Sequence, residues 1–207
     1  MHRKLFIAFG CCLVLIGIFG IAKASFMPIK AIIGQHYLEV AWIESLKNNK
    51  LSKPWRSADF FVVGELKVPR LKITRVILNS VSGEAMSWGI GLVTNIGTLS
   101  GNKPIILAGH RDSHMQFMSE LKVGDKIELM MSDGLVKSYV ISKTEVSNKP
   151  EMSLLAISSN TGNLILTTCW PFDAIQSGDQ RYLIFARSID NDTYSNNINN
   201  FFLFSQS

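Results

Sequence analysis

Cysteine and histidine are both scarce in this chain of 207 residues. The chain has three cysteines, and two of them, Cys11 and Cys12, lie in an apolar run near the N-terminus. The rest of the sequence therefore offers Cys169 no partner for an intrachain disulfide. An unpaired thiol in an oxidising compartment is normally either buried and inert or kept for its reactivity. The sequence around Cys169 therefore has to indicate whether this thiol is inert or reactive.

A strong charge of one sign is also absent. The formal net charge is +5, and no segment concentrates lysine and arginine with interleaved aromatic residues. A nucleic-acid groove requires such a segment, so we expect no DNA or RNA partner. A length of 207 residues with 47% hydrophobic residues suits one sizeable domain with accessory segments and excludes two full domains.

The single long hydrophobic run covers residues 5–22 and follows a basic end at residues 1–4. About 18 residues at ~1.5 Å each give a helix of ~27 Å, whereas the apolar part of a signal peptide is usually ~7 to 15 residues long. We therefore expect a transmembrane signal anchor with the basic end in the cytoplasm. The alternative is a cleaved signal peptide, because Ala22-Lys23-Ala24 fits a signal peptidase site.

Residues 23–54 are expected to form a juxtamembrane helix and a linker. Asn48 to Pro54 ends the helical pattern. The helix can lie on a lipid surface or pack on the domain, and the sequence leaves both options open. The amphipathic helix is predicted from apolar and aromatic residues that recur at helical spacing, namely Ile29, Ile32, Ile33, His36, Tyr37, Val40 and Ile43.

No long amphipathic helix is recognisable after Trp55. Short runs rich in β-branched residues alternate there with turn signals, which is typical of an all-β domain. Asp133-Gly134 predicts a hairpin, since both residue types tolerate positive φ. Seven or more short strands predict a closed barrel or a sandwich, and a flexible polar tail is expected at 189–207. The predicted strands are 60–68, 73–78, 104–108, 126–131, 135–144, 164–168 and 182–187.

A reactive cysteine needs a base or a cation nearby, and the chain has four histidines. His110 follows an apolar run at 104–109, where a buried strand ends, so we interpret it as the base. His114 is interpreted as an ordinary surface imidazole. Arg181 directly precedes the last predicted strand and is either a cation that stabilises an oxyanion or a strand-end arginine whose stem packs on apolar surface.

Three separated motifs surround these candidates, namely Ala108 to Asp112 with His110, Leu166 to Cys169, and Arg181. Together with Gly64 to Leu71 and Leu121 to Ile127, they resemble the sortase family over roughly 55–188. Ile165 stands where the family usually has threonine, and we expect altered packing there without loss of chemistry. More narrowly, Lys53-Pro54-Trp55 and Thr168 to Ala174 resemble the sortases of marine Gram-negative bacteria.

The resemblance implies a mostly β sortase catalytic domain at 55–188, with a closed eight-stranded β-barrel and short helices. It implies a cysteine transpeptidase in which Cys169 is the nucleophile that forms a thioacyl intermediate, His110 the general acid and base, and Arg181 the group that stabilises the oxyanion or substrate. Thr168 is expected to contribute to substrate binding. No cofactor and no metal are implied.

The implied partners are an exported protein with a C-terminal sorting signal of the Leu-Pro-x-Thr-Gly kind, and an amine acceptor. The enzyme is expected to be a single-pass protein of the inner membrane, held through residues 5–22, with its catalytic domain in the periplasm.

Three alternatives remain open at this stage. A metal-dependent hydrolase could use His110, Asp112 and His114, although a hydrolytic zinc site needs three protein ligands with suitable geometry. A cysteine hydrolase or protease could use the same catalytic residues with water in place of the amine. A membrane-anchored β-domain could bind partners without any chemistry, and the reactivity of Cys169 discriminates it from the enzymes.

Overall fold

The computed structural model describes residues 31–93, 104–148, 163–174 and 178–189, together with Gly10, Val14 and Gly17. The chain divides into a unit that ends at Tyr37 and a second unit that begins at Leu38. The predicted membrane span at 5–22 lies outside the described residues, except for Gly10, Val14 and Gly17, which are helical. Three other parts also lie outside them, namely the basic end at 1–4, Ala24 and the tail from residue 190. Within the described ranges, no helix is both long and apolar enough to cross a membrane.

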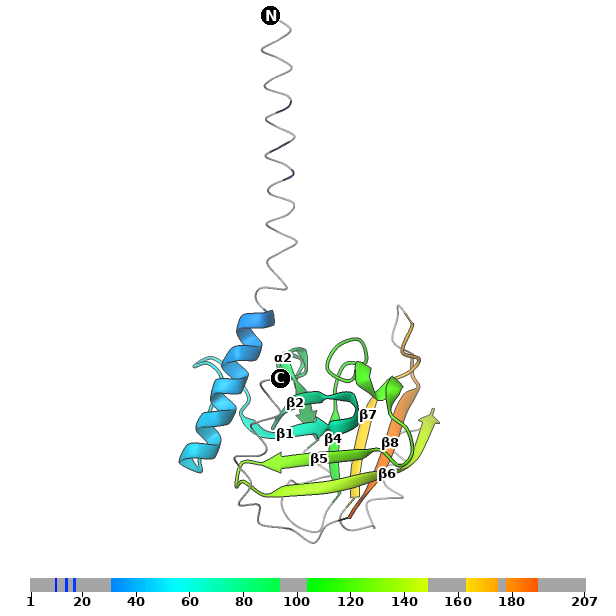
Figure 1. Ribbon diagram of the computed structural model, residues 1–207. Coiled ribbons are helices and arrows are strands. Elements are labelled where there is room, and N and C mark those ends of the chain that lie inside the picture. Colours follow the sequence, from blue (N-terminus) through cyan, green and yellow to red (C-terminus); the bar gives the residue numbers. More distant parts are fainter. Residues whose placement is uncertain are drawn as a thin grey trace, which may run out of the picture. The chain divides into compact units, whose positions relative to one another are not determined.

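The second unit contains a closed β-barrel with the strand order β1-β2-β3-β4-β7-β8-β6-β5 (Figure 1). This confirms the mostly β fold and the closed eight-stranded barrel. The strands are β1 (Val62–Val68), β2 (Ile73–Leu78), β3 (Ile90–Leu92), β4 (Ile105–Ala108), β5 (Lys126–Met131), β6 (Val136–Ser147), β7 (Asn163–Cys169) and β8 (Arg181–Ser188). The short helices are η1 (Pro69–Leu71), α2 (Gly83–Trp88) and η2 (Gln116–Glu120).

Seven of the eight strands coincide with the predicted runs, and β2 and β5 have the predicted bounds. β3 was not predicted, because three residues are too few to show an alternating pattern. The helix α2 before it was not predicted either. Its N-cap is Ser82, whose Oγ accepts a hydrogen bond from the Ala85 amide at 3.1 Å.

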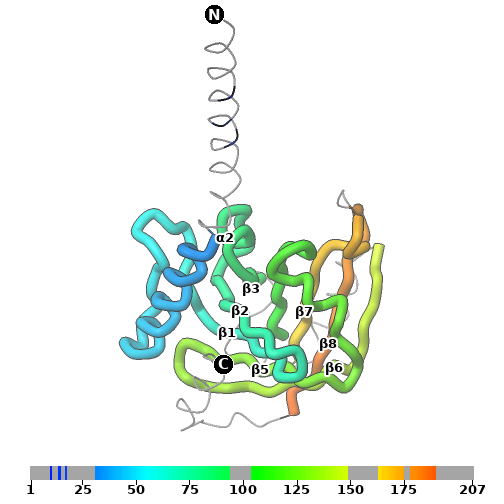
Figure 2. Tube along the Cα trace, turned by 45° about the horizontal axis from the view of Figure 1, so that its top comes forward, coloured from blue at the N-terminus to red at the C-terminus, as the bar shows by residue number. Residues whose placement is uncertain are grey.

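Two parallel pairings, β2 with β3 and β4 with β7, connect the otherwise antiparallel neighbours of the barrel (Figure 2). The hairpin between β5 and β6 forms where Asp133-Gly134 predicts it. Gly134 has φ of +80°, and the Asp133 carboxylate accepts a hydrogen bond from the Leu135 amide at 3.0 Å. The left-handed backbone at Gly134 explains why glycine stands at this position.

The barrel interior is one cluster of buried apolar side chains to which every strand contributes. Alternate residues of each strand point inward, as the two-residue period requires. Full burial of one such aliphatic side chain stabilises the fold by roughly 1.5–3 kcal/mol. Representative members of the cluster are Leu66, Ile77, Leu107, Leu129, Leu166 and Ile184, each with no exposed surface.

A second, smaller cluster lies on the outer face of β4, β7 and β8 and consists of Ile106, Ile165, Leu183 and Phe185. Ile165, the departure from the usual cysteine motif, is fully buried there. The isoleucine therefore packs in an apolar layer of the sheet.

Residues 31–48 are helical. Leu38, Ala41 and Trp42 are buried and belong to a cluster with Phe60 and Val62, so the part of the helix from Leu38 onward packs on the barrel domain. The residues whose spacing predicted the helix are not the ones that pack. Exposed fractions are 70% for Ile32, 51% for Ile33, 50% for Tyr37 and 38% each for Val40 and Ile43.

A helix is thus present at 31–48, and its buried face differs from the apolar stripe whose spacing predicted it. The packing face includes Leu38, Ala41 and Trp42, which the predicted stripe left out. Burial of an indole removes a particularly large apolar area from water, which favours the rotation of the helix that covers Trp42.

Candidate active site

The parallel pairing of β4 with β7 brings the predicted base to the predicted nucleophile. Ala108 is paired with Thr167. One residue further along, the Thr168 hydroxyl donates a hydrogen bond to the Gly109 carbonyl oxygen at 2.8 Å. Because parallel strands advance in the same direction, the next residue of each chain segment, His110 and Cys169, follows at the same end of the sheet.

Arg181 reaches the same place through the antiparallel pairing of β7 with β8, in which Cys169 and Arg181 are opposite one another. Directly opposite residues of an antiparallel pair project their side chains to the same face of the sheet. One Nη of Arg181 donates hydrogen bonds to the carbonyl oxygens of Gly178 at 2.9 Å and Gln180 at 3.0 Å. These bonds hold the guanidinium beside the end of the strand.

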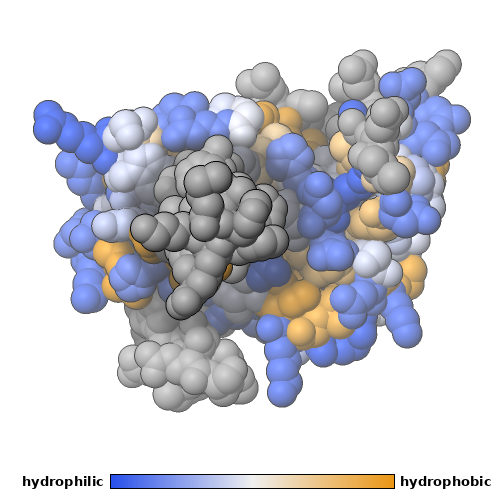
Figure 3. Space-filling view, turned by 90° about the horizontal axis from the view of Figure 1, so that it is seen from above, coloured by the Kyte–Doolittle hydropathy of each residue, from blue (hydrophilic) through white to orange (hydrophobic). Residues whose placement is uncertain are grey.

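Alternation along the strands places this group on the outer face of the barrel. Leu166 and Ile184 point into the barrel, whereas Ile165 and Leu183 belong to the outer cluster. Cys169 and Arg181 are an even number of residues from Ile165 and Leu183, so they share the outer face. Cys169 is a free, partly exposed thiol. Figure 3 views the molecule from the side at which the chain passes from β7 to β8, where apolar and polar surfaces alternate.

Gly109 allows the histidine segment to turn closely over the end of β4. A Cβ atom at this position would lie 2.9 Å from the Met115 side chain, which has no exposed surface. The segment folds back on itself, because the Met115 amide donates to the His110 carbonyl oxygen at 2.9 Å. A glycine before the histidine is therefore needed for space at this position.

Thr168 is 3% exposed, and its hydroxyl is used in the hydrogen bond to Gly109. This placement favours a role in holding the two strand ends together. The predicted contact of Thr168 with substrate remains a prediction.

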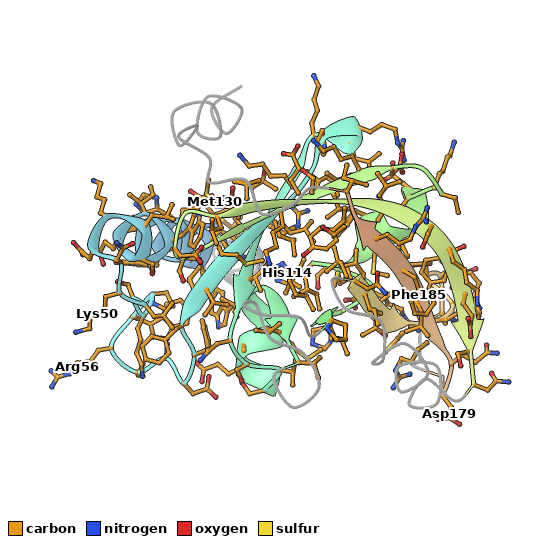
Figure 4. The ribbon with its side chains drawn as sticks, turned by 90° about the horizontal axis from the view of Figure 1, so that it is seen from below. Lys50, Arg56, His114, Met130, Asp179 and Phe185 are labelled. Carbon is orange, nitrogen blue, oxygen red and sulfur yellow. The ribbon has the colours of Figure 1, made fainter. Side chains whose placement is uncertain are left out.

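His114 is half-buried, which corrects its interpretation as an ordinary surface imidazole (Figure 4). Its Nε2 lies 3.3 Å from the Ser87 carbonyl oxygen. Burial lowers the pKa of His114, the Ser87 carbonyl partly opposes this, and the positive charge of Arg75 lowers the pKa further. Across the described segments, no three His, Cys, Asp or Glu side chains are grouped to hold a metal ion, so the metal-site alternative gains no support from them.

An aromatic cluster next to Cys169 was not foreseen from the sequence. Trp170 stacks on Tyr182 with ring centroids 5.5 Å apart, and Phe172 contacts Trp170 edge-on at 5.5 Å and Tyr182 at 5.3 Å. The Trp170 amide also donates to the Gln180 carbonyl oxygen at 3.1 Å. The cluster joins the residue after the cysteine to the residue after the arginine, and the run Trp170-Pro171-Phe172 was its sequence signal.

Arg111 is a further residue of interest. It belongs to the motif at 108–112, but the sequence alone assigns it no role. It is 8% exposed, and its Nη2 donates a hydrogen bond to the Ala174 carbonyl oxygen at 2.6 Å. A charged side chain directly after the predicted base is thus buried, which no signal in a single sequence could indicate.

Comparison with known proteins identifies the family. Residues 66–189 match the model of the Sortase domain family. Sortase D of Bacillus subtilis (strain 168) is 29% identical over 126 residues, which are 61% of this chain and 63% of that protein. The match therefore spans less than two thirds of the relative's own length.

Solved structures give the same result. The catalytic domain of B. anthracis SrtD is 29% identical, with a TM-score of 0.53 over 64% of this chain and 90% of that chain. Sortase A from Corynebacterium diphtheriae has a TM-score of 0.58 at 20% identity over 69% of this chain and 67% of that chain, a similarity of fold alone. Since the family model matches more than half of the chain, the protein belongs to the sortase family.

Proposed function

We propose that this protein is a cysteine transpeptidase that cleaves the C-terminal sorting signal of an exported protein and transfers the acyl part to an amine. Sortases as a family are cysteine transpeptidases that anchor proteins. One observation supports the assignment most directly. The strand register puts Arg181 opposite Cys169, and the last pair of β4 and β7, Ala108 and Thr167, lies two residues before His110 and Cys169.

In the first half-reaction the Cys169 thiolate attacks the carbonyl carbon of the scissile peptide bond, and the carbonyl π electrons move to oxygen. Arg181 stabilises the resulting oxyanion with charge-assisted hydrogen bonds, a contribution of ~3 kcal/mol in other enzymes. When the tetrahedral intermediate collapses, the C–N bond breaks and the His110 imidazolium gives its proton to the departing amine. The product is a thioester on Cys169.

In the second half-reaction an amine attacks the thioester carbonyl, and His110 takes the proton that the amine loses. Collapse of this second intermediate breaks the C–S bond and returns the Cys169 thiolate and the His110 imidazolium. The same imidazole thus acts as acid and then as base, a two-way role for which histidine is suited at neutral pH.

The substrate class, acceptor and location follow from the same proposal. The sorting signal is of the Leu-Pro-x-Thr-Gly kind, and the acceptor is a primary amine. The apolar run at 5–22 would hold the enzyme in the inner membrane with the catalytic domain in the periplasm. The motifs around Trp55 and Cys169 support a place among the sortases of marine Gram-negative bacteria.

The test uses the full-length protein in detergent with a fluorogenic peptide that contains such a signal, with and without an added amine. We expect amine-dependent transfer product and a thioacyl adduct on Cys169, both lost in Cys169→Ala and retained in a Cys11→Ser, Cys12→Ser control. Hydrolysed peptide alone, undiminished by amine, would establish the hydrolase alternative. Failure of a thiol reagent to label Cys169 in the folded protein would favour the non-catalytic β-domain.

A further inference from the structure

We infer that Arg111 is a positioning residue that holds His110 beside Cys169 by tying the histidine segment to the segment that follows the cysteine. The inference rests on the proposed function, and it assigns a role to a side chain outside the three catalytic residues. Its basis is the hydrogen bond from Arg111 Nη2 to the Ala174 carbonyl oxygen, 2.6 Å long between residues 63 positions apart in sequence.

The need for such a tie follows from where the strand pairing ends. The last paired residue of β4 is Ala108, so His110 lies beyond the ladder that aligns β4 with β7. The turn in which His110 lies has internal hydrogen bonds, such as that from the Met115 amide to the His110 carbonyl oxygen. These bonds set the shape of the turn, but they do not set its position relative to Cys169.

Hydrogen bonds on each side of the catalytic pair supply that position. Before it, the Thr168 hydroxyl binds the Gly109 carbonyl oxygen at 2.8 Å. After it, Arg111 binds the Ala174 carbonyl oxygen. Thr168, directly before Cys169, thus binds Gly109, directly before His110. Arg111, directly after His110, binds the segment that follows Cys169.

The burial of Arg111 supports a role within the protein. Its exposed fraction is 8%, against 3% for Thr168. A guanidinium that serves as a substrate anchor has to present its donors to solvent, whereas this one donates to a main-chain carbonyl of its own chain.

Loss of the tie should therefore impair the chemical step more than substrate binding. Small displacements of a catalytic group can cost about 100-fold in rate, even when the altered residue does not touch the substrate. We expect Arg111→Met, which keeps length and apolar contacts but removes the donor, to lower kcat about 10- to 100-fold while KM for the peptide stays within about twofold.

Arg111→Lys is the conservative variant, because an ammonium can reach a carbonyl oxygen but presents a single donor group there. Its kcat should lie between those of wild type and Arg111→Met. Arg56→Met is the matched control, since Arg56 is exposed and points away from the barrel (Figure 4), and it should retain wild-type kcat and KM.

A second readout separates this inference from the proposed function. Alkylation of Cys169 by iodoacetamide depends on the fraction of thiolate, which a neighbouring imidazolium favours, and it requires no turnover. We expect the pH at which the alkylation rate is half-maximal to shift in Arg111→Met and to remain unchanged in Arg56→Met.

Unchanged kcat in Arg111→Met overturns the inference and leaves the proposed function intact, as does a rise in KM alone, which would mark a substrate contact. If wild type forms no thioacyl adduct, the proposed function fails, and an unchanged alkylation profile in Arg111→Met then also overturns the inference. If Arg111→Met does not fold, kcat of Arg111→Lys equal to wild type overturns it.

Discussion

The Oγ1 of Thr168 donates a hydrogen bond to the carbonyl oxygen of Gly109 across 2.8 Å, in a fully enclosed position at the end of the parallel pair β4 and β7. These two residues directly precede Cys169 and His110. The bond continues the β4–β7 pairing after its last residue pair, Ala108 and Thr167, and so carries the alignment of the strands up to His110 and Cys169.

Replacement of Thr168 by valine should destabilise the domain by ~1–3 kcal/mol, because it leaves the buried Gly109 carbonyl without its donor at nearly constant side-chain volume. Transpeptidation should fall as well, since the segment of His110 loses this bond to the segment of Cys169. Urea unfolding and peptide turnover measure the two effects. Thr168→Ser keeps the hydroxyl and should retain most of both, and a serine variant as impaired as valine would argue against the hydrogen bond as the cause.

Arg181 is expected to affect catalysis and to leave stability nearly unchanged. Arg181 donates hydrogen bonds to the nearby carbonyls of Gly178 and Gln180, and the first of these bonds is exposed, so little folding energy depends on them. Arg181→Met should lower kcat about 100- to 1,000-fold, the usual cost of removing an oxyanion donor. The thermal midpoint should stay close to wild type. Loss of folding without a specific loss of kcat would support the alternative of a strand-end arginine.

The strands could be predicted because their signals are local. Short runs between turn residues predicted the observed bounds of β2 and β5, and turn residues such as Gly134 mark the observed hairpin. The three-residue strand β3 has no such signal. The pairing of β4 with β7 joins segments about 60 residues apart, so no local pattern reveals it; resemblance to the sortases, and not spacing, suggested that His110 belongs with Cys169.

Burial of polar side chains was the other limit of the sequence. Arg111 and His114 both look like surface residues, yet one is 8% exposed and the other half-buried. The sequence also left open which face of the helix at 31–48 packs on the domain. Its apolar residues are spread around the helix, and only the presence of the barrel domain decides that Leu38 and Trp42 are the ones to be buried.

The ion pair of Arg70 with Asp125 should make stability sensitive to acid. The Asp125 carboxylate accepts two hydrogen bonds from Arg70, at 2.6 and 2.7 Å, and one from the Lys122 amide at 2.8 Å. The hydrogen bonds from Arg70 lower the pKa of Asp125 below its ordinary value of 3.8. This stabilisation is fully present above the ordinary pKa of aspartate and is lost as the pH falls through the lower, folded-state value.

Asp125→Asn should therefore be less stable than wild type at pH 7, and the difference should shrink towards pH 2 to 3 in urea titrations at about those pH values. Asp59→Asn is the control, because Asp59 is exposed, and its stability should follow that of wild type. A constant difference between Asp125→Asn and wild type at every pH would show that shape, and not charge, matters at this position.

Glu65 on β1 should give a dependence of the opposite sign. Burial raises the pKa of Glu65 above its ordinary value of 4.5, and Lys67, whose Nζ lies 3.5 Å from the carboxylate, only partly offsets this. The nearby charge of Glu39 adds to the rise. The folded state therefore binds this proton more tightly than the unfolded state, and the stability contributed by Glu65 declines as the pH rises through the folded-state pKa.

In Glu65→Gln this decline should be absent. Unfolding curves of wild type and variant, measured at several pH values from about 4 to 8, should show a wild-type slope against pH that is more negative than that of the variant. Glu84→Gln serves as the control, since Glu84 is exposed at the start of α2. Parallel slopes for wild type and Glu65→Gln would contradict the raised pKa.

His114 should weaken the fold in mild acid while leaving catalysis to His110. Burial lowers the pKa of His114 below 6.5, and the positive charges of Arg75 and His110 act in the same direction, whereas the Ser87 carbonyl and Asp112 oppose it. The unfolded chain therefore takes up this proton first as the pH falls below about 6.5, and stability decreases between that value and the folded-state pKa. His114→Gln, which cannot be protonated, should lose less stability between pH 7 and about 5 than wild type in urea titrations.

The turnover of peptide by His114→Gln at pH 7.5 should remain within a few-fold of wild type, in contrast to His110→Gln, which should abolish transfer. Equal loss of turnover in both variants would mean that His114 takes part in the proton transfers.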